Sequence, residues 1–429
     1  MTYEEVQNKI AAQTRFGSKP GLERMLKLLQ MMGNPQDSLK FVHVAGTNGK
    51  GSTCALLASV LKKSRYKTGL FISPYITDFC ERMQMNGEMI AHEELAETAE
   101  KIFPLVDKMA DDGDIITEFE LITAIAFAWF AKKQCDIVVL EVGLGGRFDA
   151  TNVISTPLVS VITSISLDHT NVLGNSLAQI AREKSGIIKE DGITVCYPDQ
   201  PSEAFEVIRE TAAEKNNRLI LADVKSVVPL SMNLTGTGLL YGELLVNLPF
   251  PGKHQIKNAV TALAVLEALK EQGYHVSGHS IEAGFACASF PARMEVLSQN
   301  PMVMIDGAHN PGGMKALADA LRSYLPNKKI TAIVGMLADK DVKSSLTCLS
   351  GLISNAITLA PPAPQAMKAE ELAEQFQANG IPAFPMTNAR EALEKGLSMV
   401  EEDGVLLICG SLYLAGEVRP LALEILMKK

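Results

Sequence analysis

The sequence is poor in the residues that build broad surfaces for nucleic acids. Aromatic residues are 6% of its 429 residues, with a single tryptophan, and 40 basic residues are outnumbered by 49 acidic ones. The net charge of −9 argues against a nucleic-acid partner, because a phosphate-backbone surface needs a basic excess or at least a basic face. A small local site for an anionic ligand is still compatible with this average.

Signals for disulfides, membranes and export are also missing. The seven cysteines are scattered, odd in number and form no C-x-x-C pair, so their spacing indicates neither a disulfide framework nor a zinc site. The longest purely apolar stretch, residues 121–131, is far shorter than the ~20 residues of a membrane span. The first ten residues hold two glutamates and no apolar core. The sequence therefore predicts a cytoplasmic protein with no membrane partner.

Apolar runs alternate with helical stretches along most of the chain. The runs at 41–46, 68–73, 136–143 and 158–165 are apolar almost throughout, which is typical of strands covered on both faces and hence of a parallel sheet. Segment 224–252 breaks this rhythm with an alternating pattern between turn residues, which predicts a small antiparallel appendage. The fold class predicted for this part is α/β: a doubly wound, mostly parallel sheet that carries a phosphate-binding loop.

A second strand–helix series begins near residue 302 and predicts a smaller, Rossmann-like α/β domain. At ~100–200 residues per domain, the length allows two or three domains. We predict two, an ATP-binding domain at 1–293 and a ligase domain at 300–429.

The strongest local signal is a glycine-rich loop that follows a strand and opens a helix. Its residues are Gly46, Thr47, Asn48, Gly49, Lys50, Gly51 and Ser52. Glycines let backbone amides converge on an anion, the helix N-terminus adds its dipole, and Lys50 supplies a positive charge for outer phosphates. The spacing departs from the Walker A pattern, since only two residues separate the first two glycines and Gly51 follows the lysine. This loop is predicted to bind phosphate.

Three positions near the carboxyl ends of predicted strands are candidates for magnesium, which prefers oxygen ligands. They are Ser73, Glu141 and the pair Asp168–His169. A lone Glu141 fits a structural and a functional role equally, but the glycines at 143, 145 and 146 leave room for a ligand. His169 alone is more often a loop histidine, and imidazole is an unusual partner for magnesium.

Other polar residues have weaker support from the sequence alone. Lys184 lies on a predicted helix, where an exposed lysine is the ordinary interpretation. In the second domain, the segment from Asp306 to Asn310 follows a strand, and the segments 339–341 and 410–411 occupy equivalent places on other strands. Each could cap a helix, but three such strand ends together suggest a functional rim that faces the nucleotide.

Eight motifs in one order give the chain a resemblance to the folylpolyglutamate synthase family of Mur-ligase-like amide ligases. They are GTNGKGS, EVGLGGRFDATN, SLDHTNVLG, REKSGIIK, PGKHQIKNA, PARMEV, IDGAHNP and GSLYLAG, and they extend from about residue 40 to 416. The phosphate loop begins by residue 46, so we do not expect the separate N-terminal UDP-binding domain of the cell-wall Mur ligases.

The resemblance implies roles for individual residues. Lys50 and the rest of the loop would hold the ATP phosphates, with Asn258, Arg293 and Asp306 as further nucleotide contacts. The family's magnesium-binding positions match Ser73, Glu141 and His169, which raises the histidine above its interpretation from sequence alone. Lys184 matches a lysine that is carbamylated in the family and supports a second magnesium. On the substrate side, the family's pattern points to Tyr75, Arg82, His309 and Ser411, with His309, Asp306, Lys50 and Lys184 also expected to serve catalysis.

The implied reaction is ATP-dependent ligation of L-glutamate to a reduced folate, through an acyl phosphate. ATP and Mg²⁺ are the expected cofactors, small molecules the expected partners, and a monomer the expected state on the family pattern. Because water hydrolyses an acyl phosphate, the two domains are expected to close over the site. The cleft should be locally basic inside an acidic protein, with Lys50, Arg82, Arg147, Lys184 and Arg293 as candidates.

Three alternatives stay open. The enzyme could also join glutamate to dihydropteroate, and no motif decides this. A cell-wall amino-acid ligase is disfavoured by the missing UDP domain. A non-catalytic ATP-regulated binding protein would be favoured by loss of Lys50, Glu141 or His169, and all three are present.

Overall fold

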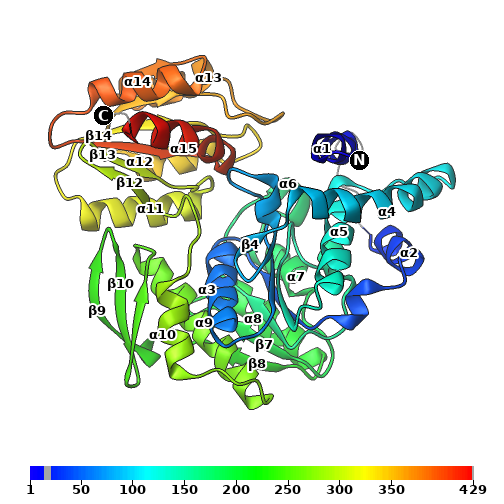
Figure 1. Cartoon of the computed structure of the whole chain (residues 1–429). Coiled ribbons are helices and arrows are strands. Elements are labelled where there is room, and N and C mark those ends of the chain that lie inside the picture. Colours follow the sequence, from blue (N-terminus) through cyan, green and yellow to red (C-terminus); the bar gives the residue numbers. More distant parts are fainter. Residues whose placement is uncertain (14–20, 428–429) are drawn as a thin grey trace.

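The computed structural model describes residues 1–13 and 21–427. Its strands form three sheets, and Figure 1 shows the C-terminal elements, coloured yellow to red, gathered beside the large N-terminal part. The predicted α/β class, with a large mostly parallel sheet and a separate smaller C-terminal one, is confirmed. Within the described residues, no helix is both long and apolar enough to span a membrane.

The large sheet has eight strands and is parallel except at one edge. In spatial order they are β4 (Glu88–Met89), β3 (Met83–Met85), β2 (Thr68–Phe71), β5 (Ile137–Glu141), β1 (Phe41–Ala45), β6 (Val159–Ile162), β7 (Ile193–Cys196) and β8 (Arg218–Leu221). The antiparallel hairpin β3–β4 at the edge was not predicted, because its two strands have only three and two residues.

Helices cover both faces of this sheet, which explains why its strands are apolar throughout. On β1, Val42 and Val44 belong to one core and Phe41 to the core on the other face. The first core packs against α3 (Lys50–Lys63), α9 (Lys253–Glu271) and α10 (Gly278–Ala286). The second packs against α1 (Tyr3–Ala12), α2 (Glu23–Met31), α4 (His92–Asp111) and α5 (Glu118–Lys132).

Short helices complete the N-terminal part and connect its strands. They are α6 (Thr170–Leu173), α7 (Leu177–Ser185), α8 (Ser202–Glu214) and the 3₁₀ helices η2 (Pro35–Ser38), η3 (Phe79–Arg82), η4 (Ala150–Val153) and η5 (Val224–Ser226). The predicted antiparallel appendage is confirmed as a three-stranded sheet in the order β11 (Leu244–Leu248), β10 (Gly236–Tyr241) and β9 (Val227–Asn233).

The C-terminal sheet has six strands, parallel except for its first. Their order is β12 (Glu295–Gln299), β13 (Met302–Ile305), β17 (Val405–Cys409), β14 (Ile330–Val334), β15 (Ile353–Thr358) and β16 (Ala383–Pro385). The helices are α11 (Pro311–Tyr324), α12 (Val342–Leu349), α13 (Ala369–Ala378), α14 (Ala389–Met399) and α15 (Leu412–Met427). Strand β12 falls in the gap left between the predicted domains at 293 and 300, and it pairs within this sheet.

One loop of the N-terminal part packs into the C-terminal core. Ile76, in the segment between β2 and η3, is 5% exposed and belongs to the core cluster that contains Leu412 and Ala415 of α15. A Cβ added at Gly416 would lie 1.8 Å from the carbonyl oxygen of Ile76, so the helix and the loop are in close contact there. The two sheets are therefore joined beside the carboxyl ends of their strands.

Candidate active site

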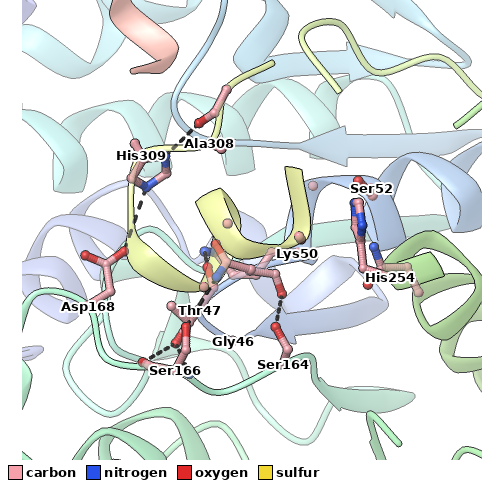
Figure 2. Close-up of a pocket in the computed structure, with 18 of the residues that line it drawn as sticks. Gly46, Thr47, Lys50, Ser52, Ser164, Ser166, Asp168, His254, Ala308 and His309 are labelled. Carbon is pink, nitrogen blue, oxygen red and sulfur yellow. Dashed lines mark hydrogen bonds and ion pairs between the residues drawn. The ribbon is translucent and has the colours of Figure 1, made fainter. Parts of the chain in front are cut away.

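The glycine-rich loop lies at the carboxyl end of β1 and lines a cavity of about 360 Å³. Gly46 has φ of 151° and Gly49 has φ of 86°, which are conformations that L side chains rarely adopt. A Cβ at Gly46 would lie 1.8 Å from Thr163 Oγ1, so the sequence needs glycine there for space as well. The amide of Thr47 donates to the carbonyl of Ser164 at 2.8 Å, which ties the loop to the end of β6. The whole predicted segment, from Gly46 to Ser52, faces this cavity, part of which Figure 2 shows.

Two of the predicted metal positions are adjacent. The backbone N–H of Ser73 donates to Glu141 Oε2 at 3.1 Å, and Lys50 Nζ lies 3.9 Å from Glu141 Oε1. Burial raises the pKa of Glu141, and the nearby charge of Lys50 opposes that rise. Glu141 is therefore a buried carboxylate with one cation beside it, at the mouth of the phosphate-binding loop.

The third predicted metal position, His169, is engaged by the C-terminal domain. Its Nε2 lies 3.1 Å from Lys340 Nζ, and the same ammonium donates to Asp168 Oδ1 at 2.7 Å. Asp168 also accepts from Asn310 Nδ2 at 2.8 Å, and His309 Nε2 lies 3.8 Å from its Oδ2. Figure 2 marks the interaction between His309 and Asp168 with a dashed line. Burial lowers the pKa of His169 to about 4, so its ring is neutral at pH 7.

Asp168 is thus the point where both domains meet. Burial alone would raise its pKa, but the nearby His309 ring and the positive charges of His169 and Lys340 hold the pKa well below its usual range. The sequence placed Asp168 among the magnesium candidates and Lys340 on the rim of the second domain, but gave no reason to pair residues that are 172 positions apart. Their contact depends on how two separate sheets pack.

Lys184 is not the exposed lysine that its helix position suggested. Its residue is 5% exposed, and its Nζ donates to the carbonyl of Gly46 at 2.8 Å. Burial and the neighbouring charge of Lys50 lower its pKa to about 7, whereas an ordinary lysine has a pKa near 10.4. The exposed interpretation is wrong, because α7 turns this side chain under the phosphate-binding loop.

The far wall of the cavity combines residues of α9 and of the C-terminal domain. Asp306 follows β13 and accepts from the backbone amides of Met294 and Ala308, both at 2.8 Å, while the Arg293 guanidinium lies 4.8 Å from the centre of the Phe290 ring. Asn258 donates to Gln255 at 2.8 Å beside Gly49. His254, which was quoted in a motif but given no role, also lines the cavity, and burial lowers its pKa to about 4.

A second cavity of about 660 Å³ adjoins the first. The residues that line both cavities include Ser73, Gly143, Leu144, Gly145, His169 and His309. The second cavity adds mostly apolar walls from Phe119, Phe148, Val172, Leu337 and Tyr413, and none of these was predicted. Their positions in the sequence carry no local motif, because each comes from a different element.

The predicted substrate residues divide in two groups around this second cavity. Arg82, His309 and Ser411 line it, and the Arg82 Nε atom is buried without a hydrogen-bond partner. Tyr75 is not among the lining residues. It lies behind Arg82, whose guanidinium carbon is 5.1 Å from the centre of the Tyr75 ring. The loop that can bind an anion, the buried Glu141 carboxylate and the apolar cavity that contains Arg82 therefore lie next to one another.

Comparisons with known proteins agree over nearly the whole chain. Residues 44–266 match the model of the Mur ligase middle domain, and residues 292–412 match that of the Mur ligase, glutamate ligase domain. The Bacillus subtilis (strain 168) dihydrofolate synthase/folylpolyglutamate synthase is 35% identical over 433 residues, covering 97% of this chain and 98% of the relative.

Two solved structures have the same fold over the full length. Mycobacterium tuberculosis folylpolyglutamate synthase complexed with ADP has a TM-score of 0.90 and 32% identity, covering 98% of each chain. The bifunctional folylpolyglutamate synthase/dihydrofolate synthase of Yersinia pestis, complexed with AMPPNP and a Mn ion, has a TM-score of 0.83 and 30% identity, again over 98% of each chain.

Proposed function

The chain belongs to the Mur ligase family, among its folylpolyglutamate synthases/dihydrofolate synthases, and from that premise we propose what its two cavities do. The protein is an ATP-dependent amide ligase that joins L-glutamate to the γ-carboxylate of a reduced folate. The carboxylate oxygen attacks the γ-phosphorus of ATP and ADP leaves. The glutamate amine then attacks the acyl carbon, loses a proton, and phosphate departs as the amide forms.

The smaller cavity holds ATP in this proposal. The amides of the loop from Gly46 to Gly49 and the N-terminus of α3 receive the phosphates, and Lys50 neutralises charge on the transferred group. Asn258 of α9, Arg293 between α10 and β12, and Asp306 after β13 complete the nucleotide site. The support is geometric: the glycines leave no room for side chains, and each named residue lines the same cavity.

Ser73, Glu141 and His169 would hold a magnesium ion beside the phosphates. A buried carboxylate with one amide contact and a histidine with a neutral ring both have lone pairs to offer, so the donor set fits a divalent cation. The ion would supply charge neutralisation for phosphoryl transfer. We expect Lys340 to release His169 when the metal site fills, because its ammonium now lies 3.1 Å from the imidazole nitrogen.

Lys184 would be carbamylated and support a second magnesium. Only a neutral amine reacts with carbon dioxide, and the pKa of Lys184 is lowered to about 7, so a large neutral fraction exists at pH 7. Its place under the loop, 2.8 Å from the Gly46 carbonyl, brings the resulting carboxylate-like group next to the phosphates. A ¹³C NMR signal of a carbamate in the parent protein equilibrated with labelled bicarbonate, absent from Lys184→Met, would support this assignment. The same spectrum in both proteins would contradict it.

The larger cavity receives the folate and the incoming glutamate. Arg82 is its buried cation and would bind a substrate carboxylate, with Tyr75 positioning the guanidinium from behind. His309 and Ser411 contribute from the second domain. The apolar walls suit a pteridine and benzoyl ring system, and division of the chain at 1–293 and 300–429 puts one wall of this cavity on each domain.

One observation carries the proposal: the phosphate-binding cavity adjoins the apolar one, and Ser73, His169 and His309 line both. A carboxylate held in the second cavity therefore meets the γ-phosphate without crossing solvent. The test is incubation of the full chain with MgATP, L-glutamate and tetrahydrofolate, with products analysed by mass spectrometry. We expect addition of glutamate units; their absence, with ADP binding intact, would contradict the proposal.

A second activity is favoured by the names of the relatives, several of which act as dihydrofolate synthases as well. The same incubation with dihydropteroate in place of tetrahydrofolate separates the two cases. Formation of dihydrofolate would make the enzyme bifunctional, and turnover of tetrahydrofolate alone would restrict it to chain extension.

A further inference from the structure

A cluster of metal-ligating side chains lies outside both cavities. Asp78 precedes η3, Cys80 lies within η3, and His92 is the first residue of α4. One ligand atom from each of these side chains lies within 4.8 Å of the other two, and the described part of the chain holds no other such trio of histidine, cysteine and carboxylate groups. Neither cavity includes any of the three. The cysteine spacing in the sequence did not indicate this site, because its members come from separate elements.

Residues on two sides hold the cluster in place: those of η3 on one side, and those of α1 and α4 on the other. Asp78 caps η3 by accepting the N–H of Cys80 at 2.7 Å, which fixes the two side chains relative to each other. On the other side, the ring of Tyr3 stacks on His92 with centroids 3.7 Å apart and planes at 4°, and its hydroxyl lies 3.5 Å from Asp78 Oδ1. Helix α1, η3 and α4 thus converge on one point.

The chemistry of the donors favours zinc over magnesium. Thiolate and imidazole are ligands for zinc, and carboxylate completes the sets in which it has three protein ligands. Zinc–ligand distances of ~2.0–2.3 Å put tetrahedral ligand atoms ~3.3–3.8 Å apart, so the trio needs to contract by only ~1 Å. His92 is exposed, which gives the ion a path from solvent.

From this geometry we propose that Asp78, Cys80 and His92 form a zinc-binding site, with water or the Tyr3 hydroxyl as the fourth ligand. The site is structural and separate from the magnesium positions of the ligase reaction. It would fasten α1 and α4 to η3, whose last residue is Arg82, the cation of the larger cavity. Zinc bound there would hold in position the loop that carries the substrate-binding arginine.

The thiol of Cys80 gives the binding reaction a clear signature. Burial and the neighbouring Asp78 raise the pKa of Cys80 to about 12, so the free site holds a protonated thiol at pH 7. A zinc ligand must be a thiolate, and binding therefore releases the thiol proton to solvent, about one per ion. No redox partner is involved.

Cobalt(II) titrated into the reduced, metal-free full chain tests the proposal. Thiolate-to-cobalt charge-transfer absorption in the near ultraviolet arises only when a cysteine binds the ion, so it separates this site from the Ser73–Glu141–His169 site. We expect one equivalent of cobalt to saturate this band, zinc to abolish it, and the titration to release about one proton per ion.

Variants make the assignment specific. Cys80→Ser and His92→Ala should weaken cobalt binding at least 100-fold, while Cys135→Ser, which changes another buried cysteine of the same core, should leave the band intact. His169→Ala should also retain it. Because His92 is exposed, its alanine variant is expected to fold, and zinc should raise the thermal midpoint of the parent but not of this variant. A missing band in the parent, or a band that persists in Cys80→Ser, would overturn the proposal.

Discussion

The two adjoining cavities are built in opposite ways. The nucleotide cavity, about 360 Å³, has as one wall a continuous segment, residues 46–52, whose glycines bring the backbone close and whose helix begins at Lys50. The larger cavity, about 660 Å³, has no such segment: Phe119, Phe148 and Tyr413 reach it from three distant parts of the chain. The first is a local structure with a local signature, and the second exists only once the sheets have packed.

The two cavities also differ in what surrounds their charged side chains. In the nucleotide cavity, Lys50 lies 3.9 Å from Glu141 and its charge opposes the rise that burial causes in the pKa of Glu141, whereas burial and the like charge of Lys50 lower the pKa of Lys184. In the larger cavity Arg82 lies beside the rings of Tyr75 and Phe79, with Glu118 and Glu141 as electrostatic partners, and its Nε has no hydrogen-bond partner. An unpaired buried donor is costly to leave without a ligand, which makes Arg82 a strong point of attachment for a carboxylate. If the two cavities bind their ligands independently, variants in one cavity should leave ligand binding in the other unchanged.

The largest effect is expected from Lys50→Ala in the nucleotide cavity. Removal of a charge aimed at the transferred phosphoryl group should lower kcat by about 10²–10³-fold, the cost of losing one preorganised donor. The folate KM should change little, because Lys50 does not line the larger cavity. Steady-state rates by mass spectrometry and the thermal midpoint check this. Lys63→Ala, at the exposed end of the same helix, is the matched control. An equal loss of kcat in both variants would contradict the proposed role of Lys50 in phosphoryl transfer.

The same contrast explains how much of the molecule could be predicted. Apolar runs on β1 and β5 correctly predicted a sheet covered on both faces, and the glycine pattern predicted the loop, because both signals are local. The hairpin β3–β4 was missed because strands of three and two residues leave no periodicity. The burial of Lys184 could not be predicted from its own segment, because helix spacing does not reveal which face a distant loop, here the one at Gly46, will cover.

Long-range contacts limited the prediction of the candidate site. His169 could be named only through resemblance, and its contact with Lys340 spans 171 positions. Phe148 and Tyr413 carry no motif of their own that marks them as cavity walls. Polar residues at strand ends were predictable from topology, whereas apolar walls were not, since an apolar side chain in a core and one in a cavity look the same in sequence.

In the larger cavity, Arg82→Met should raise the folate KM by about 10–150-fold, since a hydrogen bond to a charged group is worth ~1.5–3 kcal/mol. Methionine keeps an unbranched apolar stem and removes the guanidinium, whose carbon lies 5.1 Å from the centre of the Tyr75 ring and 5.7 Å from that of Phe79. ADP affinity, measured by calorimetry, should stay within about twofold. Arg182→Met, an exposed arginine on α7, serves as control. A parallel loss of ADP affinity would show that the cavities are energetically coupled.

Gly416→Ala tests the contact that joins the two domains beside the larger cavity. The new Cβ would lie 1.8 Å from the Ile76 carbonyl oxygen, a backbone atom, so helix α15 or the loop before η3 must move. Overpacking of this kind costs about 1–3 kcal/mol of unfolding free energy. Denaturant titration should reveal that loss, and the folate KM should rise because the displaced loop leads into Arg82. An unchanged free energy of unfolding would mean that helix α15 and the loop before η3 can move apart without loss of stability.

The smallest effect is expected at the rim of the larger cavity, from Phe148→Ala. Its ring is 45% exposed and faces the cavity beside the Arg147 guanidinium, so a ligand ring could gain only about 0.5–1.5 kcal/mol by packing on it. The folate KM should therefore rise by about 2–12-fold, with kcat and ADP affinity unaltered. Phe148→Leu should give an intermediate value, because it keeps an apolar wall without the ring face. If alanine and leucine behave alike, the ring makes no contact with substrate and the apolar wall there serves only to exclude water.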